Sequence, residues 1–158
     1  FMLAILRDRN TSASVTAAMS HLRNILSPEL FFRMFPVLLT DNGTEFSDPT
    51  AIEFPCGSLQ HTRVFYCDPN ASFQKPHVKL NHTHLRRCLP KGTSFDSLTQ
   101  DDISLMMSHI NSYVRKKFMG QSPSQLFVNA FGEETLHLLG QTLIPPEKIT
   151  LTPAVFRK

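Results

Sequence analysis

The spacing of apolar residues along the chain predicts strands and helices in alternation. Residues 1–7 (FMLAILR) are mostly apolar with weak alternation, which predicts a strand. The polar residues at 10–12 that follow favour the N-cap of a helix. Apolar side chains then recur at helical spacing: Val15, Ala18, Met19, Leu22, Ile25 and Leu26. This pattern predicts a helix that ends by Ser27, and Pro28 begins a second, shorter helix over PELFFRMF.

The next apolar run ends on an aspartate. Residues 37–39 (VLL) stand behind Pro36 without a polar break, which predicts a fully buried strand of the parallel kind. Asn42-Gly43 is a turn dipeptide, so Asp41 is expected at the carboxyl end of that strand. Ligands and catalytic groups gather at this edge of open α/β sheets. The alternative is that Asp41 only begins an Asx turn.

A loop, a strand and a helix are predicted next. Asp48-Pro49 lies in the expected loop, and residues 63–68 (RVFYCD) combine β-branched and aromatic side chains between polar flanks, as in a second buried strand. Residues 73–89 predict a helix with an apolar face, and the proline and glycine at 90–92 stop it.

The last third of the chain predicts helices and then an irregular tail. Thr99 with Asp102 resembles a capping box, and apolar spacing continues that helix to about residue 117. Ser122-Pro123 caps a helix over PSQLFVNAF, and EETLHLLG predicts a short final one. The tail, residues 144–156, is too rich in proline to be helical. Strand, helix, strand, helix is the order of an α/β fold.

The composition is that of one globular domain. Of the 158 residues, 41% are hydrophobic and 18% charged, and no window approaches the about 18 consecutive apolar residues of a membrane helix, so we expect a soluble chain without a membrane partner. No basic segment precedes FMLAIL, so it does not resemble a signal peptide. Cys56, Cys67 and Cys88 are odd in number without a CxxC spacing, which favours a reduced, cytoplasmic setting.

The net charge of +3 is less informative than its distribution. The positive charge is concentrated in LRRCLPK (85–91) and VRKK (114–117). Such patches suit a polyanion, although many are only solvated faces.

A group of histidines with one cysteine raises the possibility of zinc. The four residues are His77, His82, His84 and Cys88. On a helix only His84 and Cys88, at i and i+4, share a face well, whereas His77 points elsewhere, so zinc is disfavoured.

Several motifs occur in one order along nearly the whole chain. They are LLTDNGTEF (38–46), YCDPNASFQK (66–75), NHTHLRRCLPKGTSFDSLTQDDI (81–103), INSYVRKK (110–117) and SPSQLF (122–127). Together they resemble the catalytic core of bacterial transposases named after insertion sequence thirty, members of the retroviral-integrase superfamily. TDNG alone is a modest signal, but with LPKGTSF and the SP helix in the same order it is specific. The resemblance implies a ribonuclease-H-like fold that cuts and joins DNA with two Mg²⁺ ions held by an Asp, Asp, Glu triad.

Carboxylates suit that chemistry because two hard cations, about 3.5–4 Å apart, must bind the attacking and leaving oxygens of a phosphoryl displacement. Asp41 matches the second acid of the family motif, so the resemblance implies a catalytic metal ligand and favours this over the turn-only interpretation. The first acid of the family lies upstream of the segment that resembles FMLAILRDRNT, so we expect it to be absent here. Asp8 is not that residue, because it falls at the far end of a later strand.

The third acid is replaced by a base. In the family pattern Pro76 stands where a glycine belongs and Lys79 where the glutamate belongs. An ammonium has no lone pair for a cation and would repel Mg²⁺. Glu45 and Glu53 are poor substitutes, since Glu45 already belongs to the strand-end motif and Glu53 is expected in a loop. We therefore expect Lys79 to face the old metal site and approach Asp41, without productive Mg²⁺ binding.

The family resemblance also implies a surface for DNA. Lys75, Arg86, Arg87 and Lys91 flank the helix that faces DNA in the family, so they are candidates for phosphate contacts. The alternative is an exposed basic face without a ligand.

These inferences predict a ribonuclease-H-like α/β fold that lacks its first strands. Residues 1–120 would form the truncated core, and residues 121–158 a helical extension and proline-rich tail of the same domain. The predicted function is that of a transposase core fragment, inactive in this chain. The alternative is a noncatalytic module that binds DNA, or associates with itself or with an intact transposase, to regulate the latter. A product without a selected function is a third possibility.

Overall fold

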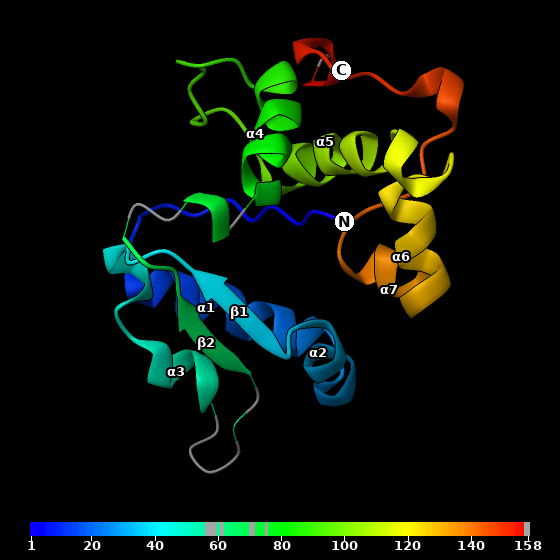
Figure 1. The fold of residues 1–158 in the computed structure, drawn as a ribbon. Helices are drawn as coiled ribbons and strands as arrows, with labels where there is room; N and C mark the ends of the chain where they lie inside the picture. The colour runs from blue at the N-terminus through cyan, green and yellow to red at the C-terminus, as the bar shows by residue number, and fades with distance from the viewer. Residues whose placement is uncertain (56–59, 61, 70–71, 75, 157–158) are drawn as a thin grey trace. The chain divides into compact units, whose positions relative to one another are not determined.

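The helices and strands gather into two units along the chain (Figure 1). The computed structural model describes residues 1–55, 60, 62–69, 72–74 and 76–156, with the backbone alone for residues 72 and 76–80. One unit is Arg7–Lys75, and the other combines Phe1–Leu6 with Pro76–Lys158. The predicted boundary at residue 120, between a core and an extension of one domain, stays a prediction.

The unit Arg7–Lys75 joins three helices to a pair of strands. Its elements are α1 (Ser12–Ile25), α2 (Pro28–Met34), β1 (Val37–Thr40), α3 (Pro49–Glu53) and β2 (Arg63–Tyr66), with a 3-10 turn at Thr44–Phe46. The predicted start of α1 is confirmed, because the Thr11 hydroxyl accepts a hydrogen bond from the Ser14 amide in a capping box. Ser27 caps α2 with Pro28 in its first turn, also as predicted.

The expected loop at Asp48-Pro49 is wrong, because these residues begin α3. The Asp48 carboxylate accepts a hydrogen bond from the Ala51 amide at 3.0 Å, and Pro49 occupies the first helical turn. Glu53 therefore ends a helix and does not lie in a loop. Its carboxylate accepts a hydrogen bond from the Val64 amide at 2.7 Å, which fastens α3 to β2.

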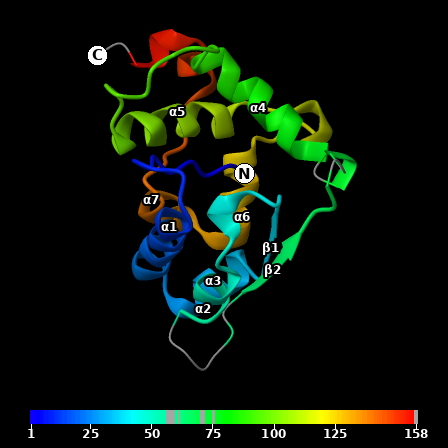
Figure 2. The same ribbon diagram turned by 90° about the vertical axis from the view of Figure 1, so that its left-hand side faces the viewer.

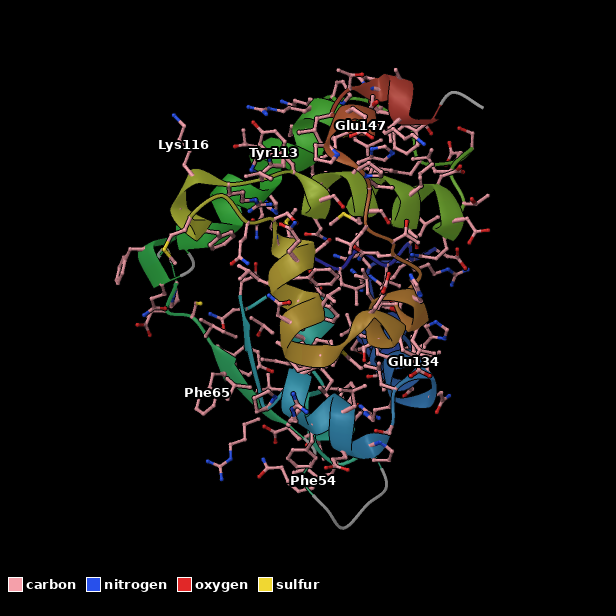
Figure 3. All side chains as sticks on the ribbon, turned by 90° about the vertical axis from the view of Figure 1, so that its right-hand side faces the viewer. Phe54, Phe65, Tyr113, Lys116, Glu134 and Glu147 are labelled. Carbon is pink, nitrogen blue, oxygen red and sulfur yellow. The ribbon has the colours of Figure 1, made fainter. Side chains whose placement is uncertain are left out.

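The strands β1 and β2 pair in parallel, with Leu38 opposite Val64. The parallel arrangement is as predicted, but full burial is wrong. Val37, Leu39 and Phe65, which share one face by their register, are 52%, 48% and 50% exposed. In Figure 3 the Phe65 side chain points away from the strand pair. The apolar run predicted that both faces of the strand pair are covered. In the structure α3 packs against β2, and the face of Val37, Leu39 and Phe65 is left about half exposed.

The unit formed by Pro76–Lys158 and the first six residues is helical. Its helices are α4 (Pro76–Cys88), α5 (Gln100–Ser112), α6 (Pro123–Phe131) and α7 (Glu133–Leu138), with 3-10 turns at Lys116–Phe118, Pro146–Lys148 and Pro153–Phe156. The 3-10 turn at Ser72–Gln74, just before α4, belongs to the unit Arg7–Lys75. The capping box of Thr99 and Asp102 is confirmed, and Ser122 caps α6 in the same way with Gln125. The tail has only 3-10 turns among its described residues, as its prolines predict.

Helices α4 and α5 cross over a common core (Figures 1 and 2). The buried cluster is Cys88, Leu89, Ile103, Met106, Met107, Ile110 and Val155. Phe1 stacks on Phe127 of α6 with ring centroids 4.1 Å apart. Apolar burial of this kind supplies most of the stability of a domain.

Residues 1–6 are extended but do not pair with a strand, so the predicted strand is wrong. Side-chain amides bind the backbone instead. Asn111 accepts a hydrogen bond from the Met2 amide at 2.9 Å and donates one to the Met2 carbonyl at 2.7 Å. Gln100 accepts from the Leu6 amide at 2.8 Å and donates to the Ala4 carbonyl at 3.1 Å. The apolar pattern predicted burial against a sheet, but helix α5 supplies the partners.

Within the described part of the chain, no helix is long and apolar enough to cross a membrane.

Candidate functional site

Asp41 follows the last residue of β1, at the carboxyl end of the strand pair. Its side chain is exposed to solvent. The Cys67 amide donates to the Thr40 carbonyl at 2.8 Å, and the Asn42 side chain donates to the Cys67 carbonyl at 3.0 Å. These bonds continue the pairing beyond both strands. Asp41 thus stands on a fixed backbone at a strand edge, as predicted, whereas its role as a metal ligand stays a prediction.

The turn after Asp41 is held against β2. The Tyr66 hydroxyl donates a hydrogen bond to the Phe46 carbonyl, which ties the 3-10 turn to the strand. Glu45 folds back over its own turn, since a Cβ built on Gly43 would lie 2.4 Å from Oε2 of Glu45. The absence of a side chain at Gly43 therefore permits the close approach of the Glu45 carboxylate.

Asp68 is a second carboxylate at this edge, and the sequence did not single it out as a site residue. It lies two residues after the end of β2, whereas Asp41 directly follows β1, and parallel strands bring such positions to one edge. The Asp68 carboxylate accepts a hydrogen bond from the side-chain Nε2 of Gln74 at 2.8 Å, and the Asp68 backbone amide donates to the side-chain Oε1 of Gln74 at 2.9 Å. The signal was present, because an aspartate also ends the predicted strand at 63–68.

The described residues do not fit a two-metal centre. No group of three or more His, Cys, Asp or Glu side chains among them is arranged to hold a metal ion. Two Mg²⁺ ions need several oxygen ligands around a shared carboxylate. The strand edge alone therefore supports no metal-dependent step.

Lys79 and Pro76 both lie in α4. Pro76 is its first residue, a position that tolerates proline because the first amides of a helix lack intrahelical partners. The Lys79 side chain is outside the described residues. Since Asp41 belongs to the other unit, the predicted approach of the two side chains stays a prediction.

The basic candidates are exposed wherever they are described. Arg86 and Arg87 lie in the last turn of α4 and Lys91 follows it, all three exposed to solvent. Lys75 is outside the described residues. The same helix buries His84 and Cys88, so α4 has a core-facing side and a basic, solvent-facing side.

The histidines and the cysteine of α4 do not form a favourable zinc site in the part of the helix that the structure describes. His84 and Cys88 share the buried face of α4, as their spacing predicted. Burial raises the pKa of the Cys88 thiol to about 11, so the thiol is protonated at neutral pH and is a poor ligand. His82 is exposed, and the side chain of His77 is outside the described residues.

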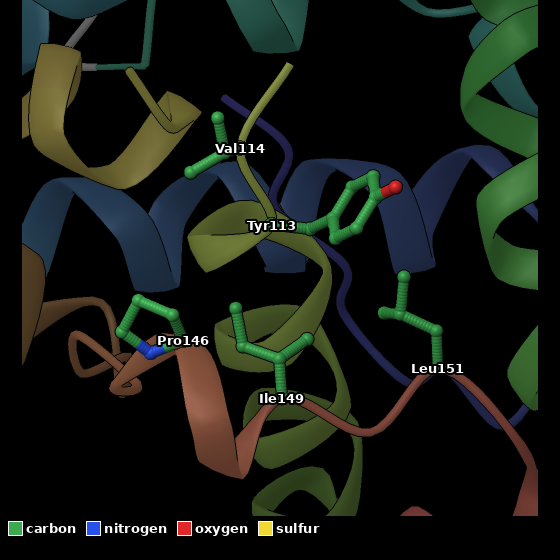
Figure 4. A pocket seen from close by; sticks show the side chains of 5 residues that line it. All are labelled: Tyr113, Val114, Pro146, Ile149 and Leu151. Carbon is green, nitrogen blue, oxygen red and sulfur yellow. The ribbon is translucent and has the colours of Figure 1, made fainter. Parts of the chain in front are cut away.

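An apolar pocket lies between the end of α5 and the C-terminal tail (Figure 4). Its volume is about 340 Å³, and its lining is Tyr113, Val114, Pro146, Ile149 and Leu151. None of these side chains carries a charge. The pocket is therefore unsuited to an anion or a metal ion.

The sequence of the chain is similar to those of two known proteins. No protein-family model matches the chain, and no solved structure matches it. It is 30% identical over 91 residues, 58% of its length, to the protein named integrase ORF3 of Spiroplasma virus SpV1-R8A2 B. It is 22% identical over 134 residues, 85% of its length, to the transposase for insertion sequence element IS1086 of Cupriavidus metallidurans. The chain is similar to transposases and integrases.

That similarity covers only part of each relative. The chain spans 27% of the integrase and 37% of the transposase. It agrees with the mixed α/β architecture and with the kind of protein that the motifs indicated.

Proposed function

We propose that the chain is part of the catalytic core of a DNA transposase of the insertion-sequence-thirty type, with a ribonuclease-H-like fold. The observation that carries the proposal is the similarity to the IS1086 transposase over 85% of the chain. The parallel strand pair supports it, because Asp41 and Asp68 follow adjoining strands at one edge. The substrate is DNA, and the reaction of the whole protein is strand cleavage and transfer.

These residues by themselves do not complete the reaction. Asp41 matches one acid of the triad that the resemblance implies, and Lys79 stands at the position of another. The described carboxylates do not fit a two-metal centre, so no step through Mg²⁺ is assigned to them. We infer that the chain is inactive alone.

A noncatalytic module that binds DNA beside an intact transposase is the second candidate. The exposed side chains of Arg86, Arg87 and Lys91 favour it, because phosphate contacts need only accessible positive charge. Both candidates bind DNA. They differ in whether Asp41 takes part in strand cleavage.

The test of DNA binding is a titration of a labelled duplex with the chain at two salt concentrations. Binding should be weak, nearly independent of sequence and weaker by about tenfold or more at 200 mM than at 50 mM salt, because counterions are released. Arg86→Ala with Arg87→Ala should reduce the salt slope by about 2. Affinity that is indifferent to salt and to this double substitution would remove α4 from the proposal.

The test of activity is nicking of supercoiled DNA in Mg²⁺ or Mn²⁺. We expect no metal-dependent nicking, and none after Lys79→Glu alone, because a bridging acid is still needed. Asp41→Ala is the matched control. Nicking that requires the metal and disappears in Asp41→Ala would show a complete site in the chain.

A further inference from the structure

Three buried nitrogen atoms near the end of α5 lack hydrogen-bond partners among the described residues. They are Nε and Nη2 of Arg115 and Nδ1 of His84. His84 is only 8% exposed, so water does not readily replace the missing partner. A buried polar group without a partner costs free energy, more so when the group is charged. This cluster therefore needs an explanation beyond packing.

The two nitrogens of Arg115 lie on one edge of the guanidinium. Nε and Nη2 donate in parallel directions, in the fork that matches two oxygens of a phosphate or a carboxylate. The backbone that carries them is fixed, because the Arg115 amide donates to the Gln121 carbonyl at 3.2 Å and the Phe118 amide to the Arg115 carbonyl at 2.9 Å. The turn that carries Arg115 thus has a fixed backbone.

His84 and Arg87 bring α4 to the same place. The His84 ring lies 6.3 Å from the ring of Tyr113, two residues before Arg115. Burial, then the positive charges of Arg115 and Arg87, hold the pKa of His84 below its usual range. His84 and Arg87 are also separated by one turn of α4. The cluster thus combines residues of α4 with Arg115, which follows α5 in the sequence.

The cluster is positive and has no counter-charge within the described residues. Burial lowers the pKa of Arg115, and no carboxylate offsets this effect. Lys116 and Lys117 follow in the turn and are exposed, and Figure 3 shows Lys116 extending outward. An anion would supply the acceptor oxygens that Nε and Nη2 of Arg115 lack.

We propose that Arg115, His84 and Arg87 form a binding site for a phosphate group. Two phosphate oxygens would accept hydrogen bonds from Nε and Nη2 of Arg115, a third from His84, and Arg87 adds charge. Free phosphate and the backbone of DNA both present such a phosphate group. The assignment to DNA rests on the proposed function. Because both Arg115 nitrogens are covered, a phosphate would reach them only when neighbouring side chains move. The Tyr113 ring, 6.3 Å from the ring of His84, is a probe of binding at His84.

The experiment follows the Nε–Hε signal of Arg115 and the ring signals of His84 and Tyr113 by NMR in the 158-residue chain. Inorganic phosphate is added at constant ionic strength, with chloride as the matched anion. We expect saturable shifts with phosphate and none with chloride. Shifts that chloride reproduces, or no saturation with phosphate, would overturn the site.

Three variants separate the fork from charge alone. Arg115→Gln should weaken phosphate binding by about tenfold or more, because charge-assisted bidentate bonds are lost. Arg115→Lys, which keeps the charge without the fork, should bind with intermediate affinity. Lys148→Gln removes one exposed charge in the same unit and should change affinity by less than about twofold. Equal losses in Arg115→Gln and Lys148→Gln would contradict a built site.

A duplex DNA titration distinguishes the sources. Shifts of Arg115 Nε–Hε with DNA, reversed by inorganic phosphate, would assign the group to the DNA backbone. Shifts of the Arg115 signal with inorganic phosphate but not with DNA would show a site for free phosphate. They would contradict only the assignment of the phosphate group to DNA. DNA binding with no response of Arg115 to either ligand would overturn this inference while the proposed function stands.

Discussion

The two units of the chain differ in how completely they bury their apolar residues. In the unit of Pro76–Lys158, Met106, Met107 and Ile110 are at most 1% exposed. In the unit Arg7–Lys75, helices α1 to α3 bury Phe31 and Ile52, yet the strand face of Leu39 and Phe65 is about half exposed. Apolar area removed from water sets stability. The helical unit therefore has a closed core, whereas the strand pair depends on one covered face.

The largest effect should come from emptying the closed core. Ile110→Ala should lower the free energy of unfolding by about 2–5 kcal/mol, because Ile110 is fully buried and leaves a cavity. Leu39→Ala should cost less than about 1 kcal/mol, since half of that side chain already contacts water. The chain has two tyrosines, Tyr66 and Tyr113, one in each unit. Urea unfolding followed by ¹⁹F NMR of fluorotyrosine therefore reads each unit separately. Similar losses at both positions would contradict the comparison.

The next largest effect concerns the amide bonds that replace a strand partner for residues 1–6. Asn111→Ala should cost about 2–3 kcal/mol, because Asn111 is fully buried and its loss leaves the Met2 amide and the side-chain oxygen of Gln141 without their partner. Gln100→Ala, in an exposed position, should cost less than about 1 kcal/mol. Urea unfolding of both variants, followed at Tyr113, measures the difference. Equal costs would show that these bonds do not hold the segment.

A smaller effect is expected from pH, again in the helical unit. His109 accepts a hydrogen bond from the Thr150 amide at Nδ1, 3.1 Å away, and burial lowers its pKa. The folded chain therefore favours the neutral ring, so the unfolded chain binds more protons below about pH 6.5 and stability falls as the pH falls. His84 contributes in the same direction. His109→Asn keeps an acceptor and should flatten part of the dependence of urea midpoints on pH. An unchanged pH profile in that variant would exclude His109.

Local signals predicted most helices, and tertiary context decided the rest. Thr11, Ser27, Thr99 and Ser122 cap helices as predicted, because a side-chain oxygen next to free amides is a local interaction. Asp48 carried the same signal and was missed, since a five-residue helix has little apolar periodicity of its own.

The failures share a physical cause. An apolar run specifies neither how many of its faces are covered nor which element covers them. Residues 1–6 pack against a helix through Asn111 and Gln100, and residues 37–39 have one covered face. The position of Asp41 at a strand edge followed from the turn after it. The burial of Nε and Nη2 of Arg115 could not be predicted from the sequence, because no local pattern indicates that an arginine side chain is covered.

We propose that DNA contacts the chain on the basic, solvent-facing side of α4 and on the turn that carries Lys116. The most direct measurement is a ¹H–¹⁵N NMR titration with duplex DNA at low salt, observed over both units. We predict that the largest shifts occur at Arg86, Arg87 and Lys116, that they disappear at high salt, and that Leu39 and Phe65 are little affected. Shifts confined to the strand face, or no shifts at all, would contradict the account.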